Sequence, residues 1–269
     1  MRDVLDISKV TLERLARVES SHFCKNSELL KDELVFLDEL RWLYYNITRH
    51  ISDDLFVPLK LMCDAGHSLV YSAMTLMRGH IVEAVGSSRR AIEAAAFAFK
   101  TKDPKVARVW IKHKTKEKEF MQDLTRSKFP KSTPLLCELQ HRWELASELG
   151  SHSTLSSQIF RHRQKDGRFE AGYFDLPDDP EIEFKRSFNY WILDTQILIL
   201  EVFQEIFKGY LNDEWKERLA RLKERYGTYK QSTLRKILKR ESPKASRLRV
   251  SPGGVILPAV GDIGRLLLR

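Results

Sequence analysis

The sequence predicts an all-α protein, a bundle of several helices with a basic helical extension near its C-terminal end. Two observations carry this prediction: helix-start signals recur along the chain, and the apolar residues between them repeat at intervals of three and four. The chain has 269 residues, of which 42% are hydrophobic and 31% charged. It therefore has enough apolar side chains for a core and too many for a disordered chain.

The clearest helix starts place a capping residue before a proline at the first helical position, where a proline has no hydrogen bond to lose. They are Asp103-Pro104, Thr133-Pro134 and Asp179-Pro180. Weaker starts of the same kind are Ser8, Ser27, Asp53 and Asp213. With the apolar spacing, these signals predict helices over residues 4–19, 27–49, 53–77, 80–100, 104–125, 134–148, 180–210 and 213–240.

The helix expected over 180–210 is apolar on two sides, which favours a place in the middle of the bundle. It also carries Asp194, Glu201 and Glu205, whose burial in a bilayer would be costly, so no membrane span is expected. Acidic residues at positions 3 and 6 argue against a secretory signal. These features predict a soluble, cytoplasmic protein.

Two further segments complete the organisation. Residues 149–179 form a long connection, in which the alternation from Arg168 to Phe174 predicts at most a short hairpin. Three scattered cysteines, Cys24, Cys63 and Cys137, have no paired spacing and predict buried free thiols.

The net charge of +9 is concentrated in one segment. Residues 214–249 contain 13 basic and 4 acidic residues, whereas the rest of the chain contains 33 of each. The expected division is a helical bundle over 1–212, a basic amphipathic arm over 213–249 and an apolar tail over 250–269.

Within the arm, apolar residues recur at alternating fours and threes and form a seam: Trp215, Leu219, Leu222, Tyr226 and Tyr229. Cations lie mostly off this seam, and cations beside tyrosines suit a surface that binds a nucleic-acid backbone. The residues predicted to bind nucleic acid are Lys230, Arg235, Lys236, Lys239, Arg240 and, in an earlier basic run, Lys112 and Lys114. The alternative is that the seam packs on the body of the protein or on a second copy of the chain. In the second case the arm would be a dimerisation helix.

The helix over 80–100 carries the candidate catalytic residues. Glu83 and Arg90 fall on the face opposite its apolar stripe, among small residues, and we expect both to be at least partly buried. In the functional hypothesis Arg90 and Glu93 point into a pocket beside the long connection, where His152 follows a helix end. The alternative is an internal salt bridge that orients helices.

Two motifs carry a family resemblance over roughly residues 50–210. The run Leu76-Met77-Arg78-Gly79-His80-Ile81-Val82-Glu83-Ala84 with Arg89-Arg90-Ala91-Ile92-Glu93-Ala94, followed by Glu148-Leu149-Gly150-Ser151-His152, resembles uncharacterised bacterial helical families. These are similar to HEPN domains (higher-eukaryote and prokaryote nucleotide-binding domains), helical bundles that include RNA-binding modules and metal-independent ribonucleases of toxin and defence systems.

The sequence departs from the catalytic members, in which an arginine is followed after four to six residues by a histidine. Arg17 with His22 and Arg108 with His113 fit, but the composition alone yields about as many matches by chance. A Glu-x-x-His unit typical of di-iron bundles occurs at Glu19 and at Glu138, yet the first lies too near the N-terminus for a second ligand helix. We expect no metal site and no cofactor.

The leading expectation is thus a nucleic-acid-associated helical protein that binds a polyanion, with RNA preferred, in a defence or toxin system. Two alternatives remain: a non-catalytic oligomeric interaction protein that forms a homodimer, and a HEPN-type ribonuclease that uses Arg90 and His152. Whether the chain is an enzyme is left open.

Overall fold

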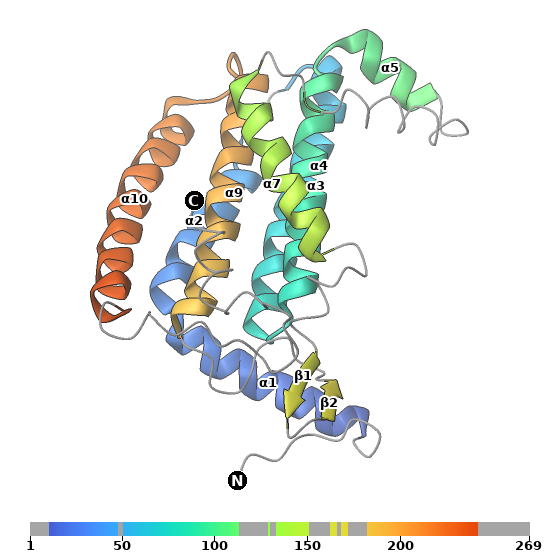
Figure 1. The fold of residues 1–269 in the computed structure, drawn as a ribbon. Coiled ribbons are helices and arrows are strands. Elements are labelled where there is room, and N and C mark those ends of the chain that lie inside the picture. The colour runs from blue at the N-terminus through green and yellow to red at the C-terminus, as the bar shows by residue number, and fades with distance from the viewer. Residues whose placement is uncertain are drawn as a thin grey trace.

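The computed structural model describes residues 11–47, 51–112, 129, 133–150, 162–165, 168–171 and 182–241, and the statements below concern those residues. Its helices, labelled as in Figure 1, are α1 (Leu12–Leu29), α2 (Lys31–Tyr45), η2 (Asp53–Leu55), α3 (Phe56–Met77), α4 (Ile81–Thr101), α5 (Pro104–Lys112), α7 (Pro134–Gly150), α9 (Ile182–Ile206) and α10 (Asp213–Glu241). Two strands, β1 (His162–Lys165) and β2 (Arg168–Ala171), form an antiparallel hairpin with His162 opposite Ala171.

The all-α prediction is confirmed, since helices hold more than half of the chain and the described strands form only this hairpin. Figure 1 shows α2, α3, α4, α7, α9 and α10 side by side along the long axis of the bundle. At one end α1 crosses beneath them beside the hairpin, and at the other end α5 projects outward.

Several predicted helix starts are confirmed. α5 and α7 begin at Pro104 and Pro134, and the Asp103 carboxylate accepts a hydrogen bond of 2.9 Å from the Lys105 amide. α10 begins at Asp213, although its capping side chain is Asn212, whose Oδ1 accepts from the Trp215 amide at 2.7 Å. The start predicted at Asp179 lies outside the described residues.

The prediction for the first two helices is wrong in its boundary. α1 runs through Ser27, the expected start of the next helix, and ends at Leu29. The reason is local: the Ser20 and Ser27 hydroxyls donate to the carbonyls of Ala16 and Phe23, four residues back, so both serines act inside the helix instead of capping one. The Thr11 side chain caps α1.

α9 occupies the middle of the bundle, as its two apolar sides predict. It contacts α2, α3, α4, α7 and α10, and its side chains from Tyr190 to Leu193 and from Ile197 to Leu200 are all buried. Its polar residue Gln196 is fully buried too, and its Oε1 accepts a hydrogen bond of 2.6 Å from the Tyr44 hydroxyl of α2.

Two glycines allow tight geometry around α3. Gly79 has a φ of 95° in the turn that joins α3 to α4, a region open to glycine at little cost. Gly66 lies where α2 and α3 approach closely, since a Cβ there would lie 3.0 Å from the Tyr44 Cβ.

The first half of α10 packs on the bundle through the predicted seam. Trp215, Leu219, Leu222 and Tyr226 are buried in the same core cluster as α2 and α9, and the Trp215 Nε1 donates to the Leu43 carbonyl at 2.8 Å. The predicted boundary at residue 213 therefore precedes a helix that contributes to the core of the bundle. The surface that the dimerisation hypothesis requires is occupied within the chain itself.

None of the three cysteines, all of them within the described residues, forms a disulfide, but the prediction of buried thiols is wrong: Cys24 is exposed, and Cys63 and Cys137 are partly exposed. Cys24 lies on α1, which covers only one end of the bundle and leaves most of its own surface in solvent. Over the described part of the chain, no helix combines the length and the apolar character that crossing a bilayer requires.

Candidate nucleic-acid interface

The two residues of α4 that were expected to be at least partly buried are on the outside. Glu83 and Arg90 are both exposed, so the prediction of their burial is wrong. α3, α7 and α9 cover the rest of α4, and the strip that stays open includes these two positions, seven residues apart. The Arg90 Nη2 donates to the Ser87 Oγ at 2.8 Å, and the guanidinium lies 5.9 Å from the centre of the Tyr71 ring.

The neighbouring arginine takes the interior position. The side chains of Arg89 and Glu93 are 25% and 24% exposed and form an ion pair of 3.2 Å. The Trp143 Nε1 of α7 donates to the same carboxylate at 2.8 Å, and the Arg89 guanidinium lies 5.1 Å from the centre of the Trp143 ring. This cluster joins α4 to α7, which matches the alternative of a salt bridge that orients helices.

The predicted catalytic residues are therefore not brought together by any described contact. Arg90 and Glu93 bind different partners, and His152 lies outside the described residues. The ribonuclease hypothesis stays a prediction.

The two Glu-x-x-His units also have other partners. Glu19 is hydrogen-bonded to His80 at 3.1 Å, and Glu138 forms an ion pair with Arg142 at 3.1 Å. In the part of the chain that the structure describes, no group of three or more histidine, cysteine, aspartate or glutamate side chains could hold a metal ion.

On the α9 side of α10, lysines recur every seven residues at Lys216, Lys223 and Lys230. Two of them bind carboxylates of α9 that are also seven residues apart: Lys223 binds Glu201, and Lys230 binds Asp194 at 2.6 Å. The Lys230 and Asp194 side chains are only 20% and 18% exposed. Lys230 thus links α10 to α9, and its contact with nucleic acid stays a prediction.

The environment of this buried pair shifts a neighbouring tyrosine. Burial raises the pKa of Tyr226 far above its usual value of 10, and the negative charge of Asp194 adds to the rise. The Tyr226 hydroxyl donates to the Tyr190 carbonyl at 3.2 Å. The hydroxyl thus stays protonated and serves the packing of α10 on α9.

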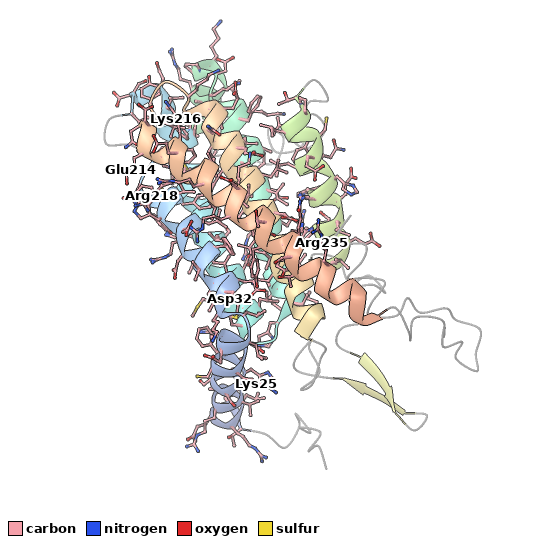
Figure 2. All side chains as sticks on the ribbon, turned by 90° about the vertical axis from the view of Figure 1, so that its left-hand side faces the viewer. Lys25, Asp32, Glu214, Lys216, Arg218 and Arg235 are labelled. Carbon is pink, nitrogen blue, oxygen red and sulfur yellow. The ribbon has the colours of Figure 1, made fainter. Side chains whose placement is uncertain are left out.

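On the α2 side of α10, three arginines line a groove. Arg218, Arg221 and Arg225 all line a cavity of about 300 Å³ that Glu39 of α2 also lines. Arg221 and Arg225 also line a second cavity, of about 600 Å³, together with Phe36 of α2. The ion-pair partners of these arginines are Glu214 at 3.3 Å, Glu217 at 4.0 Å and Glu39 at 2.6 Å. Figure 2 shows Arg218 beside the start of α10 and Arg235 towards its other end.

Towards the end of α10 the charge is no longer balanced. Arg235 is exposed and has no ion pair with the described residues, unlike the six cations that precede it on this helix. The backbone positions of Lys236, Lys239 and Arg240 belong to α10, and their side chains lie outside the described set. The same holds for Lys112 at the end of α5, and Lys114 and the tail over 250–269 lie outside the described residues altogether.

The sequence-based list of nucleic-acid-binding residues did not include the three groove arginines, although their spacing places them together. Arg218, Arg221 and Arg225 are spaced by three and four, which places them on one helix face beside the seam. Their partner Glu39 is 186 residues from Arg225 and could not be found from spacing.

Comparison with models of known protein families, with curated proteins and with solved structures found no match. The resemblance to HEPN domains therefore stays an expectation from the sequence, and the function rests on the geometry of this chain.

Proposed function

We propose that this chain is a helical protein that binds a polyanion, namely RNA, and that the end of α10 makes the primary contact with it. The observation that carries the proposal is the charge distribution: +9 over residues 214–249 against zero over the rest of the chain. A polyanion gains affinity from such a cluster because bound phosphates release their counterions.

The ion pairs of α10 narrow the proposal to part of that segment. The cations from Lys216 to Lys230 are balanced by carboxylates, so the unbalanced charge begins at Arg235. Cations with no carboxylate beside them can bind phosphate without first exchanging a partner. The role in bacterial defence or toxin systems rests on the family resemblance alone and is part of the same proposal.

The test is a salt titration of binding to a fluorescent single-stranded RNA. If about five cations contact phosphates, the logarithm of affinity should fall with the logarithm of salt at a slope of about −3.5. Changing Arg235, Lys236, Lys239 and Arg240 together to glutamine should flatten that slope by about 0.7 for each lost contact and weaken binding to all sequences alike. Glutamine is nearly as good a helix former as lysine or arginine, so α10 should persist.

The matched control changes four exposed cations near the N-terminal end of the chain to glutamine: Arg14, Arg17 and Lys25 of α1 and Lys31 at the start of α2. Both quadruple variants lose the same net charge, so only a local contact makes the α10 variant weaker than the control variant. Equal losses, or a wild-type protein that binds RNA with no salt dependence, would remove this proposal and favour the alternative of a non-catalytic oligomeric interaction protein.

A further inference from the structure

The cationic face of α10 continues back from its end along the side that faces α2. Counting from Arg218 in alternating steps of three and four leads through Arg221 and Arg225, then through the exposed polar residues Thr228 and Ser232, to Arg235. At 1.5 Å per residue this face is about 25 Å long. A linear ligand bound at Arg235 could therefore follow the helix to the groove.

The groove has the space and the chemistry for such a ligand. Its cavities of about 300 Å³ and 600 Å³ lie between α2 and α10, and the side chains of Arg218, Arg221 and Arg225 are 43%, 64% and 55% exposed. The Arg218 guanidinium stacks 3.9 Å from the centre of the Trp42 ring, and that of Arg225 lies 5.8 Å from the Phe36 ring. Rings that hold guanidinium groups leave their N–H edges available for the oxygens of phosphates.

The carboxylates that now bind these arginines are weak competitors. An exposed ion pair shifts an equilibrium by only about fivefold at most, whereas each phosphate contact also releases counterions. Glu39 is the only one of the three partners that comes from another helix, and it links α2 to α10 through Arg225.

We propose that the groove between α2 and α10 is a second binding surface for single-stranded RNA, on which Arg218, Arg221 and Arg225 bind successive phosphates after Arg225 exchanges Glu39 for the ligand. This inference rests on the proposed function and extends the contact beyond the end of α10. Lys223 and Lys230, on the opposite flank, keep their carboxylates on α9.

The first test compares Arg221→Gln with Arg17→Gln, using a fluorescent single-stranded oligouridylate as the probe. Each arginine is exposed and pairs with a glutamate four residues earlier on its helix, so the two variants lose the same charge and the same kind of pair. Arg221→Gln should weaken binding about fivefold at 0.1 M salt and flatten the slope by about 0.7, the values expected for one phosphate contact. Arg17→Gln should change neither.

The second test removes the competitor. Glu39→Gln releases Arg225 and should tighten binding about two- to fivefold, with the slope unchanged because Arg225 contacts a phosphate in both proteins. The matched control is Glu13→Gln on α1, which gives the same gain in net charge and breaks the exposed pair with Arg17. It should leave both the affinity and the slope unchanged.

The outcomes separate the two proposals. If Arg221→Gln behaves like Arg17→Gln and Glu39→Gln like Glu13→Gln, the groove is not a binding surface, whatever the end of α10 does. If the quadruple variant at the end of α10 has no effect while the groove variants do, the groove stands and the primary contact has been misplaced. If the wild-type protein does not bind the probe, both proposals fail. Circular dichroism of each variant shows whether it is folded.

Discussion

At the scale of single residues, Arg89 and Arg90 show how one position along a helix decides between interior and solvent. A step of one residue turns a helix by about 100°, so adjacent side chains face different neighbours. Arg89 points to α7 and binds Glu93 beside the Trp143 ring, whereas Arg90 lies on the open strip of α4.

This difference predicts opposite effects of two similar substitutions. Arg89→Ala leaves the three-quarters buried Glu93 carboxylate without its cation and should reduce the free energy of unfolding by about 2–3 kcal/mol. Arg90→Ala removes an exposed side chain and should change that free energy by no more than about 0.5 kcal/mol. Urea unfolding of both variants measures the difference, and equal losses would contradict the assigned orientations.

The sequence could identify α4 as a helix with charged residues among small ones, but it could not choose their direction. The choice depends on which sides of α4 are covered by α3, α7 and α9, and those helices are distant in the chain. The spacing correctly places Glu83 and Arg90 on the side of α4 opposite its apolar stripe. Ser87 and Ala94 lie on that same side and are nevertheless buried, so the side of the helix alone does not decide exposure. Small residues let a neighbouring helix approach, and that contact is tertiary.

At the scale of elements, the main features of α10 were predictable from the sequence. The seam, the start at Asp213 and the position of most cations beside the seam were predictable from spacing. α10 continues through Gly227 to Glu241, in agreement with the single helix predicted over 213–240. A glycine in a helix weakens it without necessarily breaking it.

Gly227 therefore offers a stabilising substitution. No atom lies within 4 Å of a Cβ placed there, so Gly227→Ala should raise the free energy of unfolding by about 0.5–1 kcal/mol through helix propensity alone. At Gly66 the same change should give less, because the new methyl would lie 3.0 Å from the Tyr44 Cβ. Thermal unfolding of the two variants gives the comparison, and a loss of stability in Gly227→Ala would contradict the open space described there.

At the scale of the whole molecule, ion pairs link the neutral body to the basic segment. Glu39, Asp194 and Glu201 lie on the body, and each binds a cation of α10. Composition could locate the excess of positive charge but not its pairing, because the partners are between 22 and 186 residues apart. The pairing decides which part of the excess is available to a ligand.

Buried tyrosines predict how the whole fold responds to high pH. Burial raises the pKa of Tyr44 and of Tyr226 well above 10 in the folded state, so both stay protonated while the unfolded chain begins to lose these protons. Stability should be unaffected by these groups below pH 10, and above it should fall by up to about 1.4 kcal/mol per pH unit for each tyrosine.

Urea unfolding between pH 9 and pH 11 tests this response. Tyr226→Phe should make the fall less steep, because phenylalanine has no proton to lose in the unfolded chain. Tyr210→Phe is the matched control, since Tyr210 is 39% exposed and its removal should leave the slope as in the wild type. A fall of equal steepness in all three proteins would show that other groups cause it.

The contacts of α2 with α9 and α10 have a consequence for synthesis on the ribosome. Leu43 accepts a hydrogen bond from Trp215, 172 residues later, and Tyr44 binds Gln196, 152 residues later. At translation rates of about 5–20 residues per second, α2 waits about 10–30 s for these partners. During that interval its apolar side is open to chaperones and to other nascent chains, and α10 completes its burial only after it has been made.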